Sequence, residues 1–238
     1  MALITREELE TLWTGRYVEN WPDEMLSLIK EMETVNPLTT IIEIGVRTCG
    51  TFRLWERLVP AEEGMVIGVD CSPEEELLKF SGVSTKTPQL MSSREVLPDA
   101  TFWNRMPSSS VYEENCTEDC LDLEASDRQL HFAIGESTSI EVHNKIAEIL
   151  GDRQADFIFH DGCHSGDVPL KDFDNIIQPF LRSGGLFALA DVGDQISWRI
   201  NDGTLALCKR LSNGQTLPAV KPSIPLVNRA GIALWRKP

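Results

Sequence analysis

Short apolar runs alternate with segments of helical periodicity through most of this sequence. Each apolar run ends in glycine or aspartate and has the length of a buried strand, and the runs cover 39–45, 66–70, 130–135, 155–161 and 185–191. Apolar residues recur at helical spacing between them, at 51–58, 137–150 and 167–182. Pro179 is a candidate kink in the last of these segments. This alternation predicts an α/β fold with a doubly wound, mostly parallel sheet that helices cover on both faces.

The two ends of the chain depart from this alternation. Two helices are predicted before the first strand, at 5–14 and 22–34, which makes 1–37 a helical leader. Near the other end, 205–211 fits either a strand or a helix and 231–236 fits a strand. A terminal antiparallel hairpin is compatible with this pattern.

A long segment interrupts the alternation between the second and third apolar runs. Between Asp70 and Leu130 lie 59 residues, far more than a crossover between parallel strands requires. We therefore interpret 72–129 as an insertion, which carries twelve acidic and five basic residues. It is either a solvated loop or a lid over a ligand crevice at the sheet edge. The chain has 42% hydrophobic residues, enough for one core, and we expect 1–238 to be a single domain.

The amino-acid composition limits the classes of partner that this chain can bind. The formal net charge of −15 opposes binding to a phosphate backbone, so we expect no nucleic-acid partner. No apolar run approaches the length of about 20 residues that a membrane span requires, and 1–10 contains Arg6 and three acids instead of an apolar signal core. We expect a soluble, cytoplasmic protein without a membrane partner. Its six cysteines show no zinc-type pairing and are interpreted as reduced thiols.

The first apolar run leads into a turn that contains glycine and then into a helix. Gly45 and Gly50 allow the backbone of 41–51 to pass close to a ligand, although many crossovers use glycine for packing alone. Asp70 ends the next run, where a carboxylate can accept both hydroxyls of a ribose. The alternative is a helix cap, because Ser72 and the residues after it resemble a helix start.

Polar residues also follow the later apolar runs. Asp161 ends the fourth run, His164 follows three residues later, and Asp191 ends the fifth run. Each of them alone fits a cap or a turn. Because the carboxyl ends of neighbouring parallel strands meet at one edge, we expect the three side chains to converge in one crevice.

The order of these motifs resembles the class I S-adenosylmethionine-dependent methyltransferases. More narrowly, it is similar to the subgroup of cephalosporin hydroxylase-type and macrolide sugar O-methyltransferases. The motifs are the Glu43-Ile44-Gly45 turn, Val69-Asp70, Ile134-Gly135-Glu136-Ser137, 156–164 and 181–191, together with Leu12-Trp13-Thr14-Gly15, Trp21-Pro22-Asp23 and 231–235 at the two ends. The similarity covers most of the chain outside the insertion.

The resemblance implies a seven-stranded sheet with an antiparallel last strand and a methyl donor along its carboxyl edge. It places Gly45, Arg47 and Gly50 beside the methionine part of S-adenosylmethionine, Asp70 at the ribose and 135–137 beside the adenine. The full expected donor site, which also binds the product S-adenosylhomocysteine, comprises Glu43, Gly45, Arg47, Gly50, Thr51, Asp70, Cys71, Gly135, Glu136, Ser137 and Asp161.

The resemblance also implies a catalytic set of Asp161, His164 and Asp191, with His164 as general base. In the subgroup, acids after the fourth and fifth strands often hold Mg²⁺, which here indicates Asp161, Asp191 and Asp194. Three departures weaken this carry-over. Cys49 replaces a glycine of the turn beside the expected donor. Cys163 replaces a second acid, and Val192 follows Asp191 where a metal ligand is usual, so metal dependence stays open.

We therefore expect an O-methyltransferase that acts on a hydroxyl of a small molecule such as a sugar or polyketide in natural product biosynthesis. Two alternatives remain. A donor-binding or partner-binding protein of the same fold without catalysis is one. A nicotinamide-dependent oxidoreductase is the other, although 45–50 does not provide its tighter G-x-G-x-x-G turn. Neither the acceptor nor the oligomeric state follows from the sequence, which leaves a homo-oligomer open.

Overall fold

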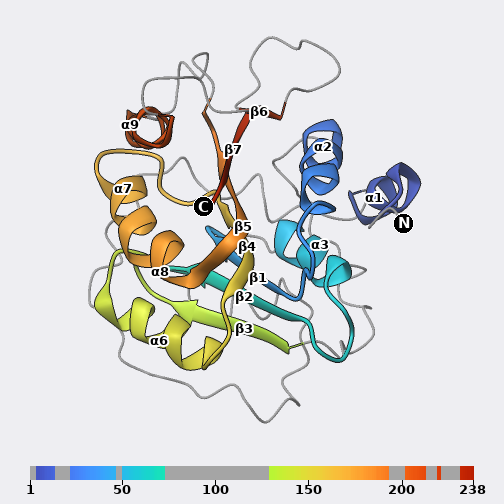
Figure 1. Cartoon of the computed structure of the whole chain (residues 1–238), viewed down its shortest axis with the longest axis horizontal. Helices are drawn as coiled ribbons and strands as arrows, with labels where there is room; N and C mark the ends of the chain where they lie inside the picture. The colour runs from blue at the N-terminus through green and yellow to red at the C-terminus, as the bar shows by residue number, and fades with distance from the viewer. Residues whose placement is uncertain are drawn as a thin grey trace.

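The computed structural model describes residues 4–13, 22–46, 50–72, 129–192, 202–212, 219–220 and 231–238. These residues form one seven-stranded sheet of order β3-β2-β1-β4-β5-β7-β6 (Figure 1). The strands are β1 (Thr40–Ile44), β2 (Met65–Asp70), β3 (Gln129–Ile134), β4 (Ala155–His160), β5 (Leu181–Ala190), β6 (Ala219–Val220) and β7 (Ile232–Arg236). In this sheet order, β3, β2, β1, β4 and β5 are each parallel to their neighbours, whereas β7 is antiparallel to β5 and β6. The expected doubly wound, mostly parallel sheet is confirmed.

Helices cover both faces of the sheet (Figure 1). One face packs against α1 (Arg6–Trp13), α2 (Pro22–Met32) and α3 (Gly50–Leu58). The other packs against α6 (Ile140–Leu150), α9 (Asp202–Leu211) and a helical segment made of α7 (Val168–Asp172), the π-helical turn η3 (Phe173–Ile177) and α8 (Gln178–Phe180).

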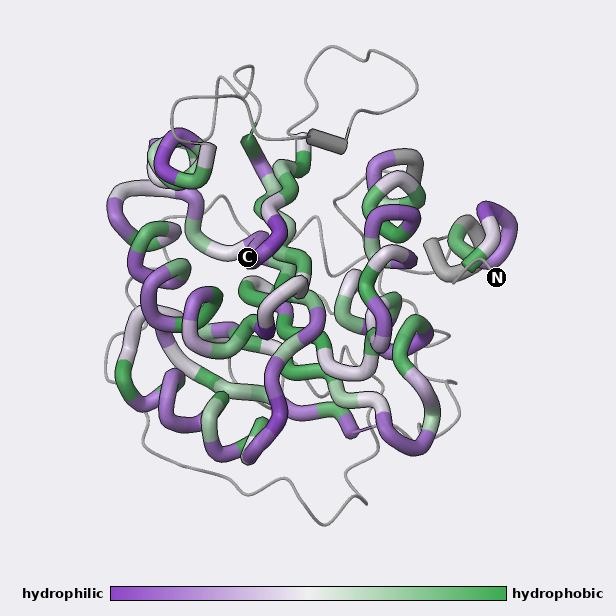
Figure 2. The backbone as a smooth tube through the Cα atoms, viewed as in Figure 1, coloured by the Kyte–Doolittle hydropathy of each residue, from purple (hydrophilic) through white to green (hydrophobic). Residues whose placement is uncertain are grey.

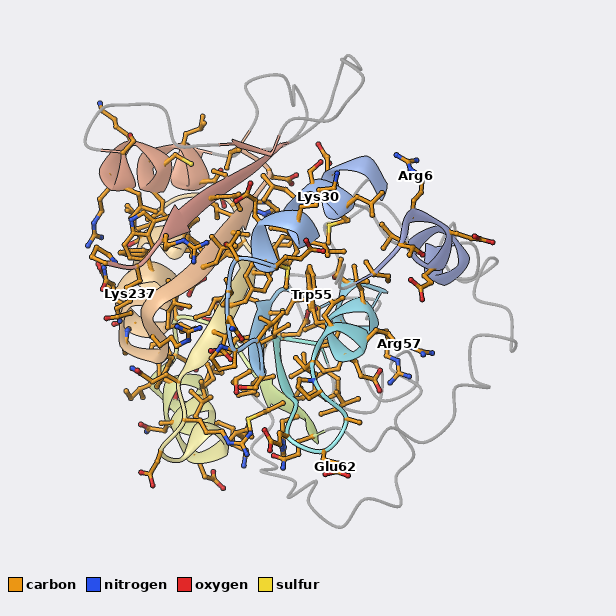
Figure 3. The ribbon with its side chains drawn as sticks, turned by 45° about the vertical axis from the view of Figure 1, so that its right-hand side comes forward. Arg6, Lys30, Trp55, Arg57, Glu62 and Lys237 are labelled. Carbon is orange, nitrogen blue, oxygen red and sulfur yellow. The ribbon has the colours of Figure 1, made fainter. Side chains whose placement is uncertain are left out.

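The two cores follow from the alternation of side chains along each strand. Ile41 of β1 belongs to the core under α2 and α3, and the next residue, Ile42, belongs to the core under α6 and η3. All six residues of β4 are buried, as expected for a parallel strand covered on both faces. The central strands are coloured mainly as hydrophobic in Figure 2. In Figure 3, Trp55 of α3 lies in the interior, whereas the exposed Arg57 lies at the periphery.

Several element boundaries differ from the sequence-based prediction. The helix predicted for 137–150 begins at Ile140, because the Ser139 hydroxyl caps it by accepting the Val142 N–H at 3.3 Å. The segment 205–211, which fitted a strand or a helix, lies in α9. The antiparallel pairing near the C-terminus is formed by β6 and β7.

The helical segment predicted for 167–182 ends at Phe180 and widens before Pro179. Proline has no N–H to donate, and its ring crowds the carbonyl four residues earlier. The chain responds with a π turn, in which the Gln178 N–H donates to the carbonyl of Phe173, five residues back. The predicted kink is therefore a local widening, and β5 begins at Leu181.

Part of the prediction lies outside the described residues. Of the insertion 72–129, only Ser72 and Gln129 are described, so its interpretation as a loop or a lid remains a prediction. The single domain over 1–238 also remains a prediction. Within the described part of the chain, no helix is both long enough and apolar enough to cross a membrane.

At the amino edge of the sheet, the buried carboxylate of Asp156 holds the start of β1. Its Oδ2 accepts the backbone N–H groups of Thr39 at 2.7 Å and Thr40 at 2.9 Å. Its Oδ1 accepts a hydrogen bond from the guanidinium of Arg182 at 2.5 Å. Charge-assisted bonds of this kind connect the first residues of β1, β4 and β5.

Replacing Asp156 with alanine should lower the free energy of unfolding by about 3 kcal/mol, because a partly buried guanidinium and two backbone N–H groups lose their acceptor. Asp174→Ala is the matched control. It breaks an ion pair with Arg210 whose side chains are about half exposed, so it should cost less than about 1 kcal/mol. Urea unfolding of both variants measures the difference, and equal losses would contradict this role of Asp156.

Candidate active site

The turn after β1 packs directly on the end of β4. Gly45 has a φ of +88°, and a Cβ at this position would lie 2.4 Å from the carbonyl oxygen of Asp161. The Gly45 N–H donates to Val69 at 2.9 Å, and the Asp161 N–H donates to Ile44 at 2.8 Å. Both the backbone conformation and the close approach therefore require glycine. The sequence analysis placed Gly45 beside a ligand, and the structure shows that the packing of this turn on β4 already requires a glycine there.

Asp70 connects this turn to the end of β2. Its Oδ2 accepts the Val46 N–H at 2.8 Å, and its Oδ1 accepts the Ser72 N–H at 2.7 Å. The side chain is partly exposed at the carboxyl edge of the sheet. A carboxylate oxygen can accept a second hydrogen bond, so this geometry is compatible with the predicted ribose contact. That contact remains a prediction.

The three predicted catalytic residues converge at the same edge. Nδ1 of His164 lies 3.3 Å from Oδ2 of Asp191, and Nε2 lies 3.5 Å from Oδ1 of Asp161. The side chains of His164 and Asp191 are each 9% exposed and that of Asp161 is 18% exposed, so the cluster is sheltered and Asp161 is its most exposed member. One ligand atom from each residue lies within 4.8 Å of the others. The imidazole therefore lies between two carboxylates.

Asp191 is in the left-handed region of the backbone, with a φ of +57°. In the part of the chain that the structure describes, no other residue except glycine has a positive φ. Such a conformation is uncommon for residues with a Cβ and is found most often at functional sites. With this backbone conformation, Oδ2 of Asp191 lies 3.3 Å from Nδ1 of His164.

Glu43, predicted in the donor site, is fully buried inside the sheet-helix interface. Its carboxyl group accepts a hydrogen bond from the hydroxyl of Thr51, the second residue of α3. Burial raises the pKa of Glu43 well above its usual range; the Thr51 hydrogen bond opposes this, and the nearby charges of Asp161 and Asp70 add to it. Glu43 and Thr51 therefore bind each other through their side chains, and together they join β1 to α3.

A buried polar network that the sequence analysis missed lies beside the site. Oδ2 of Asp172 accepts the Ser137 hydroxyl at 2.9 Å and lies 2.9 Å from Nε2 of His160. Asp172 and His160 have no exposed surface. The Ser137 side chain, predicted to border the adenine, thus binds α7. The polar His160, directly after the apolar residues 157–159 of β4, was the available signal.

Of the remaining residues that the sequence analysis named, some are described and some are not. Gly50 begins α3, and Gly135 and Glu136 directly follow β3. The thiols of Cys71 and Cys163 are free and exposed. Arg47, Cys49 and Asp194 lie outside the described residues.

Comparison with known proteins relates the fold to solved structures. No protein-family model matches the chain. No curated protein sequence matches it either. Among solved structures, the MycE methyltransferase of the mycinamycin pathway, in complex with Mg, SAH and mycinamycin VI, has a TM-score of 0.52 and 18% identity over 98% of this chain. The chain spans 53% of the length of MycE.

Two further structures extend the similarity over chains of comparable length. An O-methyltransferase from Bacillus cereus in complex with SAH has a TM-score of 0.54 and 14% identity, covering 96% of this chain and 88% of its own. The TDP-rhamnose 3'-O-methyltransferase of calicheamicin biosynthesis has a TM-score of 0.51 and 15% identity, covering 97% of this chain and 92% of its own. At these identities the similarity establishes the fold alone, a Rossmann-like α/β fold that this chain shares with these structures.

The buried Glu43 predicts a specific dependence of stability on pH. Because its pKa is raised in the folded state, it stabilises the fold at pH values below its ordinary pKa of about 4.5, and this contribution is lost as the pH rises through the folded-state pKa. Glu43→Gln cannot ionise. Relative to the wild type, its free energy of unfolding should therefore rise with pH above about 4.5, by up to about 1.4 kcal/mol per pH unit.

Urea unfolding between pH 4 and pH 8 measures this difference. Glu148→Gln is the control, because Glu148 is 65% exposed and pairs with Lys145 on the surface of α6. Its difference from the wild type should stay flat above pH 5. A flat difference for Glu43→Gln as well would show that Glu43 is ionised in the folded protein.

Proposed function

We propose that this chain is an S-adenosylmethionine-dependent O-methyltransferase that acts on a hydroxyl of a small molecule. The observation that carries the proposal is the convergence of Asp161, His164 and Asp191 at the carboxyl edge of β4 and β5, beside the Gly45 turn and Asp70. In open α/β sheets, ligands bind at this edge where the strand order reverses, which here is between β1 and β4.

The donor would lie along the ends of β1, β2 and β3. Asp70 is already held by the N–H groups of Val46 and Ser72, so its carboxylate is fixed before a ribose arrives. Gly135 and Glu136 would border the adenine. A carboxylate that is held in place before the donor binds favours catalysis. Methyl transfer is an in-line displacement, in which the protein mainly aligns the sulfonium methyl group with the attacking oxygen.

His164 would remove the acceptor proton. As the O–C bond forms, the S–C bond breaks, S-adenosylhomocysteine leaves, and the hydroxyl proton moves to the imidazole. Imidazole suits this role because a ring nitrogen can accept a proton while the other donates to a carboxylate. Asp191 at Nδ1 would orient the ring, and both carboxylates would stabilise the positive charge that the ring gains. A sugar or polyketide of natural product biosynthesis is the acceptor class we propose, and the similarity to MycE and to the TDP-rhamnose enzyme supports it.

The same residues fit a divalent cation. Carboxylate oxygens are the ligands that Mg²⁺ prefers, and neighbouring oxygens in its octahedral shell are about 2.9 Å apart. The ligand atoms of Asp161, His164 and Asp191 all lie within 4.8 Å of one another. Asp161 and Asp191 would hold the ion, and His164 would remain the base. When bound, the ion lowers the pKa of a coordinated hydroxyl.

Binding of S-adenosylhomocysteine tests the donor site. Isothermal titration of the wild type should show binding, and Asp70→Ala should weaken it by about 1–3 kcal/mol, since the ribose hydroxyls lose their acceptor. Asp70 also holds backbone groups, so the 3′-deoxy analogue is titrated in parallel. The analogue should bind the wild type more weakly than the parent compound does, whereas Asp70→Ala should not discriminate between them. Equal discrimination by both proteins would place Asp70 outside the ribose site.

Turnover tests the catalytic set. The wild type should convert S-adenosylmethionine to S-adenosylhomocysteine with an acceptor from a panel of TDP-rhamnose, mycinamycin VI, caffeoyl-CoA and further sugars and polyketides. His164→Ala should lower kcat by about 10²–10⁴ while donor affinity is kept. His131→Gln on β3 is the control and should keep both kcat and donor affinity.

Chelation that abolishes turnover, with recovery on adding Mg²⁺, would establish the metal, whereas a fully active His164→Ala variant would refute the mechanism. Donor binding without methylation of any acceptor would favour the non-catalytic alternative.

A further inference from the structure

The first turn of α9 binds the loop that carries His164. The backbone N–H groups of Gly203 and Thr204 donate to the carbonyl oxygen of His164 at 3.1 Å and 3.2 Å. On the exposed side of the same turn, Oδ1 of Asp202 accepts the Gly166 N–H at 3.0 Å. The first N–H groups of a helix have no partner within the helix, so a carbonyl group at this position is well placed to satisfy them. The loop 161–167 is therefore fixed at two points by one helical turn.

The same turn also holds Asp191. The hydroxyl of Thr204 donates to the carbonyl oxygen of Asp191 at 3.3 Å, and Thr204 has no exposed surface. Asp191 has a left-handed backbone conformation, and its Oδ2 lies 3.3 Å from Nδ1 of His164. Such a conformation persists only when its surroundings hold it in place. Thr204 therefore contacts the backbones of both residues, His164 through its N–H and Asp191 through its hydroxyl.

Gly203 allows the first turn of α9 to approach the loop 161–167 closely. A Cβ on Gly203 would lie 2.6 Å from the carbonyl oxygen of Gly166, 2.8 Å from Pro169 and 2.9 Å from the carbonyl oxygen of His164. A side chain at this position would displace α9 from the loop. Glycine second in the helix costs some helix propensity, and the close approach explains its presence.

We propose that the first turn of α9 (202–204) is a clamp that sets the spacing between His164 and Asp191, and that Thr204 is its central positioning residue. Thr204 contacts neither donor nor acceptor in this role; it acts through the two backbones that it joins. The roles of His164 and Asp191 in catalysis rest on the proposed methyltransferase function, whereas their positions do not.

The imidazole signals of the protein test the clamp without any activity. The chain has four histidines, so a ¹H–¹⁵N spectrum of the imidazole rings is readily assigned, with His164→Gln identifying the His164 signal. Thr204→Val keeps the branched shape and removes the hydroxyl. Thr204→Val should shift or broaden the His164 signal and leave the His131 signal in place. Thr204→Ser keeps the hydroxyl and should show the His164 signal at its wild-type position. Thr40→Val, which removes another buried threonine hydroxyl at the opposite edge of the sheet, is the control and should leave His164 unchanged.

Function supplies a second readout. With the acceptor panel above, Thr204→Val should lower kcat by up to about 100-fold, the effect of a displacement of about 1 Å. S-adenosylhomocysteine should bind with unchanged affinity, because the proposed donor site is along the ends of β1, β2 and β3. If Thr204→Val does not fold, Asp202→Ala takes its place, since its lost bond is on the exposed side of the turn.

The outcomes separate this proposal from the proposed function. A His164 signal that is unchanged in the folded Thr204 or Asp202 variant would refute the clamp, whatever the activity. A wild type that neither binds S-adenosylhomocysteine nor methylates an acceptor would refute the methyltransferase function, while the imidazole spectrum would still decide on the clamp. Loss of kcat in Thr204→Val without rescue by Thr204→Ser would contradict the role of the hydroxyl.

Discussion

The turn after β1 and the end of β4 approach so closely that Gly45 has no room for a side chain. This contact lies where the strand order reverses, with β2 on one side of β1 and β4 on the other. It determines where Asp161 emerges from the sheet, and the Val46 N–H next to it binds Asp70. The predicted donor half and the acceptor half of the site are therefore connected through one stretch of backbone. A change in this packing would move both halves together.

Acidic groups gather at this edge, and their environments separate their roles. Glu43 is buried under α3, where burial raises its pKa and favours the neutral form. Asp70 and Asp161 are partly exposed, whereas Asp191 is buried beside His164. A cationic sulfonium donor is electrostatically compatible with such an edge. Glu43 is thus a structural link between β1 and α3, and the partly exposed acids are available for ligands.

The site is supported by contacts from elements that are distant in sequence. Asp172 on α7 connects Ser137 after β3 with His160 at the end of β4. The first turn of α9 holds His164 and, through Thr204, Asp191. The Asp172 contacts join side chains, and the α9 contacts hold the backbones of His164 and Asp191. They explain how polar residues far apart in the chain keep a spacing of a few ångströms.

Local patterns in the sequence determined the strands, most of the helices and the residues at the strand ends. Segments with a continuous apolar centre, such as 157–159 within 155–161, indicate burial on both faces. The convergence of Asp161, His164 and Asp191 follows from the rule that parallel strands end at one edge. Only the tertiary structure decided what each side chain binds. Glu43 and Thr51 met across the interface between β1 and α3, Ser137 bound Asp172, and Thr204 reached Asp191. These contacts join residues whose distance depends on the packing of helices against the sheet, and periodicity within one segment carries no information about that distance.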